Sequence, residues 1–86
     1  MSYRVVFTKR FQKDYKNLPG EIRNKIDRQI KRLAKGDFFY PSLRAKKMEG
    51  EEKTWEASIT MNYRIVFYLE EDTITFLKAG IHDVLG

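Results

Sequence analysis

Residues 55–69 read WEASITMNYRIVFYL, and this stretch predicts two β-strands joined by a tight connection. Successive side chains of a strand point to opposite faces, so alternation sorts the pair into an apolar and a polar face. The apolar face would comprise Trp55, Ala57, Ile59, Tyr63, Ile65, Phe67 and Leu69. Glu56, Ser58 and Arg64 fall on the opposite face, which we expect to be exposed and to carry the function.

The composition predicts one small folded domain over residues 1–86. Hydrophobic residues make up 42% of the chain and aromatic residues 14%, enough for a packed core. With no cysteine and one histidine, we expect neither disulfides nor a structural zinc site. The sequence also lacks an apolar run of roughly 20 residues, the length of a membrane span, and an N-terminal signal-peptide core. We therefore expect a cytoplasmic protein that contacts no membrane and uses no metal or cofactor.

The charge is divided unevenly along the chain. Residues 1–47 carry 14 Lys and Arg against 4 Asp and Glu, whereas residues 48–86 carry 3 against 8, which gives the net +5. A basic half of this density favours an anionic partner, either a nucleic acid or an acidic protein. The alternative is a helical surface that is merely solvated by its lysines and arginines.

Two amphipathic helices are predicted ahead of the central stretch, after a short strand at residues 3–7. Thr8 is placed to cap the first helix, whose apolar stripe is Phe11, Tyr15 and Leu18. Residues 19–20, Pro-Gly, separate it from the second helix. The apolar stripe of that second helix is Ile22, Ile26, Ile30, Leu33 and Ala34. The opposite side of the second helix is basic, and Gly36 ends it.

Strands dominate the rest of the chain. Residues 37–54 are irregular, with a short strand or extended approach within 43–48, and a last strand is expected at 73–79. Tight connections between consecutive strands imply antiparallel pairing. The order predicts an α+β fold, β-α-α-β-β-β, with a twisted, mainly antiparallel sheet and the N-terminal helical hairpin packed on one face.

These elements together resemble the RelE/ParE superfamily of bacterial toxins, and more closely the RelE-like mRNA interferases. The resemblance spans essentially the whole chain, as a single RelE-like domain. It is carried by the opening strand, the basic hairpin, LRAKKMEG at 43–50, the strand from Trp55, NYRIVF at 62–67 and GIHD at 80–83.

The resemblance implies a type II toxin that cleaves mRNA in the ribosomal A site and is blocked by a cognate antitoxin. It assigns Arg64 to the scissile phosphate and His82 to proton transfer. Some relatives have lysines on the aromatic-led strand, where this chain has Glu56 and Ser58. This difference leaves either a Glu56, His82 and Arg64 set with Glu56 as base, or an impaired nuclease.

Further residues are candidates for RNA contacts around this set. Arg44, Lys46 and Lys47 would bind the backbone at the rim. Ser58 and Asn62 are candidate phosphate or ribose donors, and Asp83 would orient His82.

Structural explanations remain for the same residues. Arg64 and Glu56 could form a cross-strand ion pair without any chemistry, and His82 could be a surface histidine. At the level of the whole chain, the alternatives are a ParE-like inhibitor of gyrase or an inactive fold-mate that binds an antitoxin.

Overall fold

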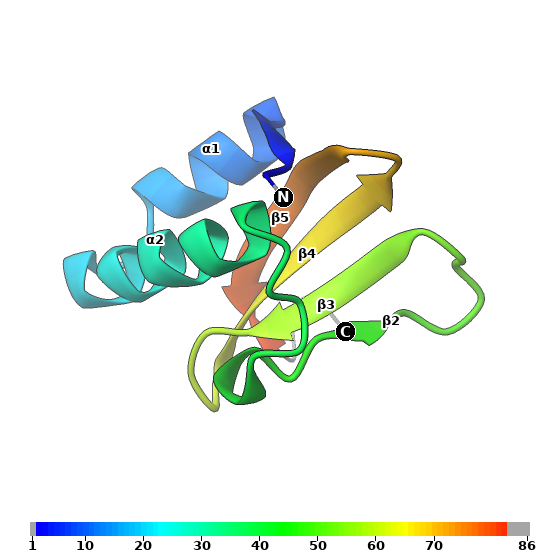
Figure 1. Ribbon diagram of the computed structural model, residues 1–86. Helices are drawn as coiled ribbons and strands as arrows, with labels where there is room; N and C mark the ends of the chain where they lie inside the picture. The colour runs from blue at the N-terminus through cyan, green and yellow to red at the C-terminus, as the bar shows by residue number, and fades with distance from the viewer. Residues whose placement is uncertain (1, 83–86) are drawn as a thin grey trace.

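A five-stranded mixed sheet carries two helices on one of its faces (Figure 1). The computed structural model describes residues 2–82. In chain order the elements are β1 (Arg4–Phe7), α1 (Lys9–Lys16), α2 (Gly20–Ala34), the 3₁₀ turn η1 (Pro41–Leu43), β2 (Lys46–Lys47), β3 (Thr54–Ser58), β4 (Tyr63–Glu70) and β5 (Thr73–Ile81). Neither α1 nor α2 is long and apolar enough to cross a membrane, and the same holds for every helix within 2–82.

The strands lie in the order β1-β5-β4-β3-β2, so β1 and β2 form the two edges of the sheet. Every neighbouring pair is antiparallel except β1 and β5, which run parallel. The α+β class, the element order and the mainly antiparallel sheet predicted from the sequence are therefore confirmed. Of the strand expected within residues 43–48, only the two residues of β2 form one.

The helical hairpin begins as the sequence predicted. The Thr8 hydroxyl accepts a hydrogen bond from the Phe11 amide at 3.1 Å, which satisfies a free donor of the first turn of α1. Phe11 itself is buried against the sheet. The second helix starts at Gly20, directly after Pro19, because proline cannot continue the first helix.

Two positions in the predicted stripe of α2 are wrong. Ile22, Ile26 and Leu33 are buried as expected, but Ile30 and Ala34 are only half-buried, and Gln29 is buried beside Ile30. Residue 29 lies one turn beyond Ile26 on the side of the helix nearest the end of β3. There its amide nitrogen donates to the Ser58 carbonyl at 3.3 Å, so a polar side chain is satisfied in the interior.

Aromatic rings link the helices to the sheet. The Phe11 and Phe76 ring centroids lie 5.3 Å apart, and Phe76 lies 5.8 Å from Phe67. Phe67 in turn stacks on Trp55 across the β3–β4 pair at 6.5 Å. Contacts in this range add to the burial of apolar area, so the chain of rings fixes how α1 sits on the sheet.

An irregularity in β5 changes which side chains face the core. Val66 pairs with Lys78 but Phe67 pairs with Phe76, so Leu77 is an extra residue on the β5 side. Phe76 and Ala79 consequently both face the helices although they are three residues apart. The same bulge directs Lys78 to the opposite face of the sheet.

Replacing Ile26 with alanine should lower the free energy of unfolding by about 2–5 kcal/mol, because its buried side chain would leave a cavity. The matched variant Ile30→Ala should cost only about 1 kcal/mol, since Ile30 is half-buried. Urea unfolding followed by the fluorescence of Trp55 measures both. Equal losses of stability for the two variants would contradict the packing described for α2.

Candidate functional site

The second face of the sheet carries a row of polar side chains. Glu56 pairs with Lys46 on one side and Val66 on the other, and Val66 pairs with Lys78. Directly paired residues of neighbouring antiparallel strands share a face. Lys46, Glu56 and Lys78 therefore lie on one row across four strands, as the alternation of β3 and β4 predicted for Glu56.

A second row lies nearer the β3–β4 turn. Ser58 pairs with Arg64, and Arg64 pairs with Gly80. The ladder continues past β5, because the His82 amide donates to the Asn62 carbonyl at 2.7 Å. The fold thus brings Arg64, Ser58, Asn62 and His82 to the same end of the sheet.

The expectation that this face is exposed is wrong at two positions. Glu56 and Ser58 are each only 8% exposed, and Val66 is buried as well. Glu56 has paired neighbours on both flanks and Arg64 against its carboxylate, so a side chain of its length is covered. A carboxylate in such a place needs a cationic partner.

Arg64 supplies that partner and also closes the turn. Its Nε lies 3.6 Å from Glu56 Oε1, and the two side chains are only 16% and 11% exposed. Its Nη1 donates to the carbonyls of Thr60 at 2.6 Å, Met61 at 3.0 Å and Tyr63 at 3.1 Å. The cross-strand ion pair considered in the sequence analysis is therefore present. Arg64 presents its charge at the site while holding residues 60–63 in place.

His82 is half-buried beside this turn. Within residues 2–82, its Nδ1 is a buried nitrogen without a hydrogen-bond partner. An unpartnered imidazole nitrogen can accept or donate a proton if a ligand reaches it. Asp83, predicted to orient this ring, lies outside the described residues.

The predicted RNA-binding cations separate onto different sides. Lys46 lies on the row of Glu56, whereas Lys47 pairs with Trp55 on the helix side, and its Nζ is 5.8 Å from the indole ring. Arg44 is exposed in a left-handed conformation with φ 46° at the end of η1. Lys78 also lies on the face of Glu56, a position that the sequence does not predict because the bulge in β5 leaves no local signal.

A separate apolar groove lies between the two helices. Its volume is about 630 Å³, and it is lined by Phe7, Phe11, Gln12, Lys13, Tyr15, Lys16, Asp27 and Ile30. Phe7 is 42% exposed in it, and the Tyr15 hydroxyl donates to Asp27 Oδ1 at 2.8 Å across it. That hydrogen bond raises the pKa of Tyr15 above its usual value. Tyr15, expected in a core stripe, is half-buried and lines this groove, which no pattern in the sequence predicts.

Removing Arg64 should destabilise the protein, because Glu56 would remain as a largely buried carboxylate without its cation. We expect Arg64→Ala to lower the free energy of unfolding by about 1–3 kcal/mol. The double variant Arg64→Ala/Glu56→Gln should recover part of this stability. A double-mutant cycle measured by urea unfolding checks this expectation. If the losses of stability in the two single variants simply add up in the double variant, Arg64 and Glu56 are not coupled.

Comparison with known proteins relates this arrangement to solved structures. The chain matches no protein-family model and no curated protein. It superposes on a chain of the RelB–RelE antitoxin–toxin complex from Methanococcus jannaschii with a TM-score of 0.78 and 29% identity, covering 93% of each chain. A chain of the archaeal RelE–RelB complex from Pyrococcus horikoshii superposes with a TM-score of 0.79 and 21% identity, covering 94% of this chain and 96% of that one. A chain of the DinJ–YafQ toxin–antitoxin complex from E. coli superposes with a TM-score of 0.85 and 16% identity, covering 99% of this chain and 98% of that one. The fold of the chain is thus that of the RelE-like toxin superfamily.

Proposed function

We propose that this protein is the toxin of a type II toxin–antitoxin pair and that it cleaves mRNA in the ribosomal A site. The observation that carries the proposal is the ion pair of Arg64 with Glu56 on the polar face, together with the backbone bond that holds His82 opposite Asn62, two residues before Arg64 in the chain. The likeness to toxins solved with their antitoxins supports the assignment. Such a protein would act in the cytoplasm, with the ribosome, mRNA and an antitoxin as partners.

The proposed chemistry is transfer of the phosphoryl group within the RNA strand. Glu56 accepts the proton of the 2′-hydroxyl, whose oxygen attacks phosphorus and forms the 2′,3′-cyclic phosphate. The bond from phosphorus to the 5′-oxygen breaks, and His82 protonates that leaving oxygen. Arg64 stabilises the negative charge that develops on the phosphate oxygens. The nucleophile belongs to the substrate, so the scheme requires no metal-bound water.

The remaining candidates would position the RNA. Lys46, on the row of Glu56, and Arg44 and Lys47 at the rim would contact backbone phosphates. Ser58 and Asn62 would donate to phosphate or ribose oxygens at the level of Arg64. These contacts carry no base specificity, because phosphate and sugar are the same in every nucleotide.

One observation favours a second candidate function. The Arg64 side chain already bonds three carbonyls and Glu56, so gripping a phosphate requires it to exchange some of these contacts. A chain in which Arg64 is purely structural would be a ParE-like gyrase inhibitor or an inactive binder of an antitoxin. Induced expression with mapping of transcript ends separates the two. Cuts within translated codons support the nuclease, and DNA damage with intact transcripts supports the gyrase inhibitor.

The groove between α1 and α2 is the surface that we assign to the antitoxin. Its floor is apolar, with Phe7 exposed, and its rim carries Lys13 and Lys16 against the single carboxylate of Asp27. An amphipathic segment with an apolar and an acidic face fits both features. The groove lies on the helix side of the sheet, away from the row of Glu56.

Substitutions at the site should affect cutting far more than substitutions on the solvated helix. His82→Ala should slow ribosome-dependent cleavage by about 10²–10⁴-fold, because it removes a proton-transfer group. Arg64→Lys keeps the positive charge but should slow cleavage about 10²-fold or more, because an ammonium cannot hold two phosphate oxygens at once as the planar guanidinium does. Lys31→Ala should cost little, since Lys31 is exposed on α2.

The readouts are growth arrest and in vitro cleavage of ribosome-bound mRNA, with and without chelator. Melting temperatures measured in parallel separate loss of chemistry from loss of fold. Unchanged cleavage by the His82 variant would remove that residue from the mechanism. Abolition of wild-type cleavage by chelator would overturn the scheme of internal transfer.

Charge reversal at the groove should weaken antitoxin binding. Lys13→Glu/Lys16→Glu would place two carboxylates against an acidic partner, and we expect at least about a tenfold rise in the dissociation constant at low salt. The matched reversal Lys31→Glu/Lys35→Glu lies at the C-terminal end of α2, outside the groove, and should change the dissociation constant much less. Calorimetric titration with the antitoxin from the adjoining reading frame measures both, and equal effects would reject the groove as the docking site.

A further inference from the structure

A basic hollow lies beside the β3–β4 turn, between α2 and η1. Its volume is about 290 Å³, and it is lined by Lys25, Arg28, Gln29, Arg32, Ser42, Ile59 and Thr60. These lining residues, all within the described part of the chain, supply three cations and two hydroxyls but no carboxylate. Cations and hydroxyl donors around one small hollow are the groups that bind a phosphate.

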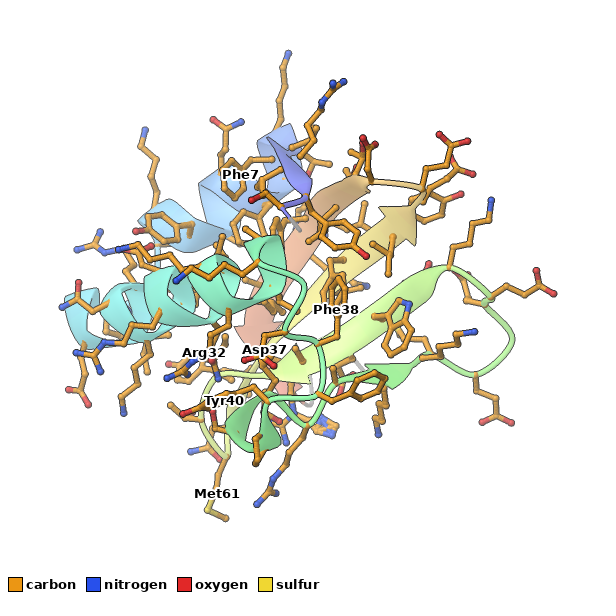
Figure 2. All side chains as sticks on the ribbon, viewed as in Figure 1. Phe7, Arg32, Asp37, Phe38, Tyr40 and Met61 are labelled. Atoms are coloured by element: carbon orange, nitrogen blue, oxygen red, sulfur yellow. The ribbon has the colours of Figure 1, made fainter. Side chains whose placement is uncertain are left out.

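Arg32 is held in place within this hollow. Its Nη1 donates to Gln29 Oε1 at 2.6 Å and lies 3.5 Å from the Ser42 hydroxyl. Its guanidinium carbon is 3.9 Å from the centre of the Tyr40 ring, and Figure 2 shows the two side chains together beneath α2. Stacking leaves the edges of the guanidinium plane for hydrogen bonding, so the cation is presented in a fixed orientation.

Gln29 anchors the hollow to the sheet. It is 4% exposed, and its amide nitrogen donates to the Ser42 hydroxyl and to the Ser58 carbonyl, each at 3.3 Å. Helix α2, η1 and the end of β3 are thereby tied together around the cations. A merely solvated helix face would need none of these buried contacts.

Thr60 connects the hollow with the candidate site. Thr60 lines the hollow, and its carbonyl accepts the 2.6 Å hydrogen bond from Arg64. The two groups of cations therefore lie on either side of one turn. A strand whose scissile phosphate contacts Arg64 would carry a neighbouring phosphate toward Arg32.

Exposed nonpolar side chains border the same region. Phe39, which precedes Tyr40 in the sequence, is 81% exposed. Met61 is 88% exposed at the tip of the β3–β4 turn (Figure 2). Proteins that bind single-stranded nucleic acid combine a cationic track with aromatic rings on which bases stack. Phe39 has the exposure that such stacking requires.

We propose that the hollow formed by Lys25, Arg28 and Arg32 binds a backbone phosphate of single-stranded RNA, with a neighbouring base stacked on Phe39. The inference rests on the proposed function, since it extends the RNA path from Arg64 around the turn. The basic side of α2 would then contact the RNA at a defined phosphate, and would not act only by long-range attraction from its lysines and arginines.

Titration of the ¹⁵N-labelled full chain with a 2′-O-methylated hexanucleotide tests this, because that RNA cannot undergo internal transfer. The Thr60 amide and Arg32 side-chain signals should shift and saturate. Lys25→Gln/Arg28→Gln should raise the dissociation constant about tenfold or more, because charged hydrogen bonds to the phosphate are removed. The slope of the binding constant against salt should also fall by about one for each phosphate that is no longer neutralised. Phe39→Ala should weaken binding about fivefold or more.

The control is Lys31→Gln/Lys35→Gln, which removes the same charge from the same helical segment outside the hollow. It should change the dissociation constant by about twofold at most, as a screened long-range effect. Equal weakening in the two double variants, or no shift at Thr60, would overturn the proposal. Binding is measured without cleavage, so a failure here is distinct from a failure of the nuclease assignment.

Discussion

Burial of β4 on both faces is the constraint on which the rest of the structure depends. Ile65 and Phe67 are fully buried under the helices, and Val66, between them, is 1% exposed on the other face. β4 pairs with β3 on one side and β5 on the other, so both neighbours take their register from it. A shift of one residue would move every one of these side chains to the wrong face. The polar face is therefore positioned by the same packing that builds the core.

Arg64 connects this packing with the candidate chemistry. It belongs to the buried strand, holds the turn through three carbonyls and neutralises Glu56. Any substitution of Arg64 therefore alters the turn and the candidate site together. The same contacts orient the guanidinium, and a ligand that binds it has to replace some of them.

Local patterns in the sequence were sufficient for most of the fold. Alternation around Glu56 and Arg64 predicted the correct faces of β3 and β4, and the Thr8 cap predicted the start of α1. The bulge at Leu77 could not be predicted, because it depends on how β5 pairs with β4 and leaves no local signal. The burial of Glu56 and the hollow around Arg32 likewise arise from segments distant in sequence. The chemistry of individual residues was readable from the sequence, while the cavities they form depended on tertiary contacts.

The two edges of the sheet differ in a way that bears on self-association. β2 ends one edge with only Lys46 and Lys47, and short, lysine-bearing edge strands resist pairing with another chain. β1 ends the other edge, where Val6 and Phe7 are each 42% exposed. The lysines of β2 thus oppose pairing at one edge of the sheet, whereas the β1 edge exposes apolar side chains that can associate with another molecule. A partner that covers the β1 border would act as a solubility factor as well as a ligand, and preparations lacking it would be prone to aggregate through that border.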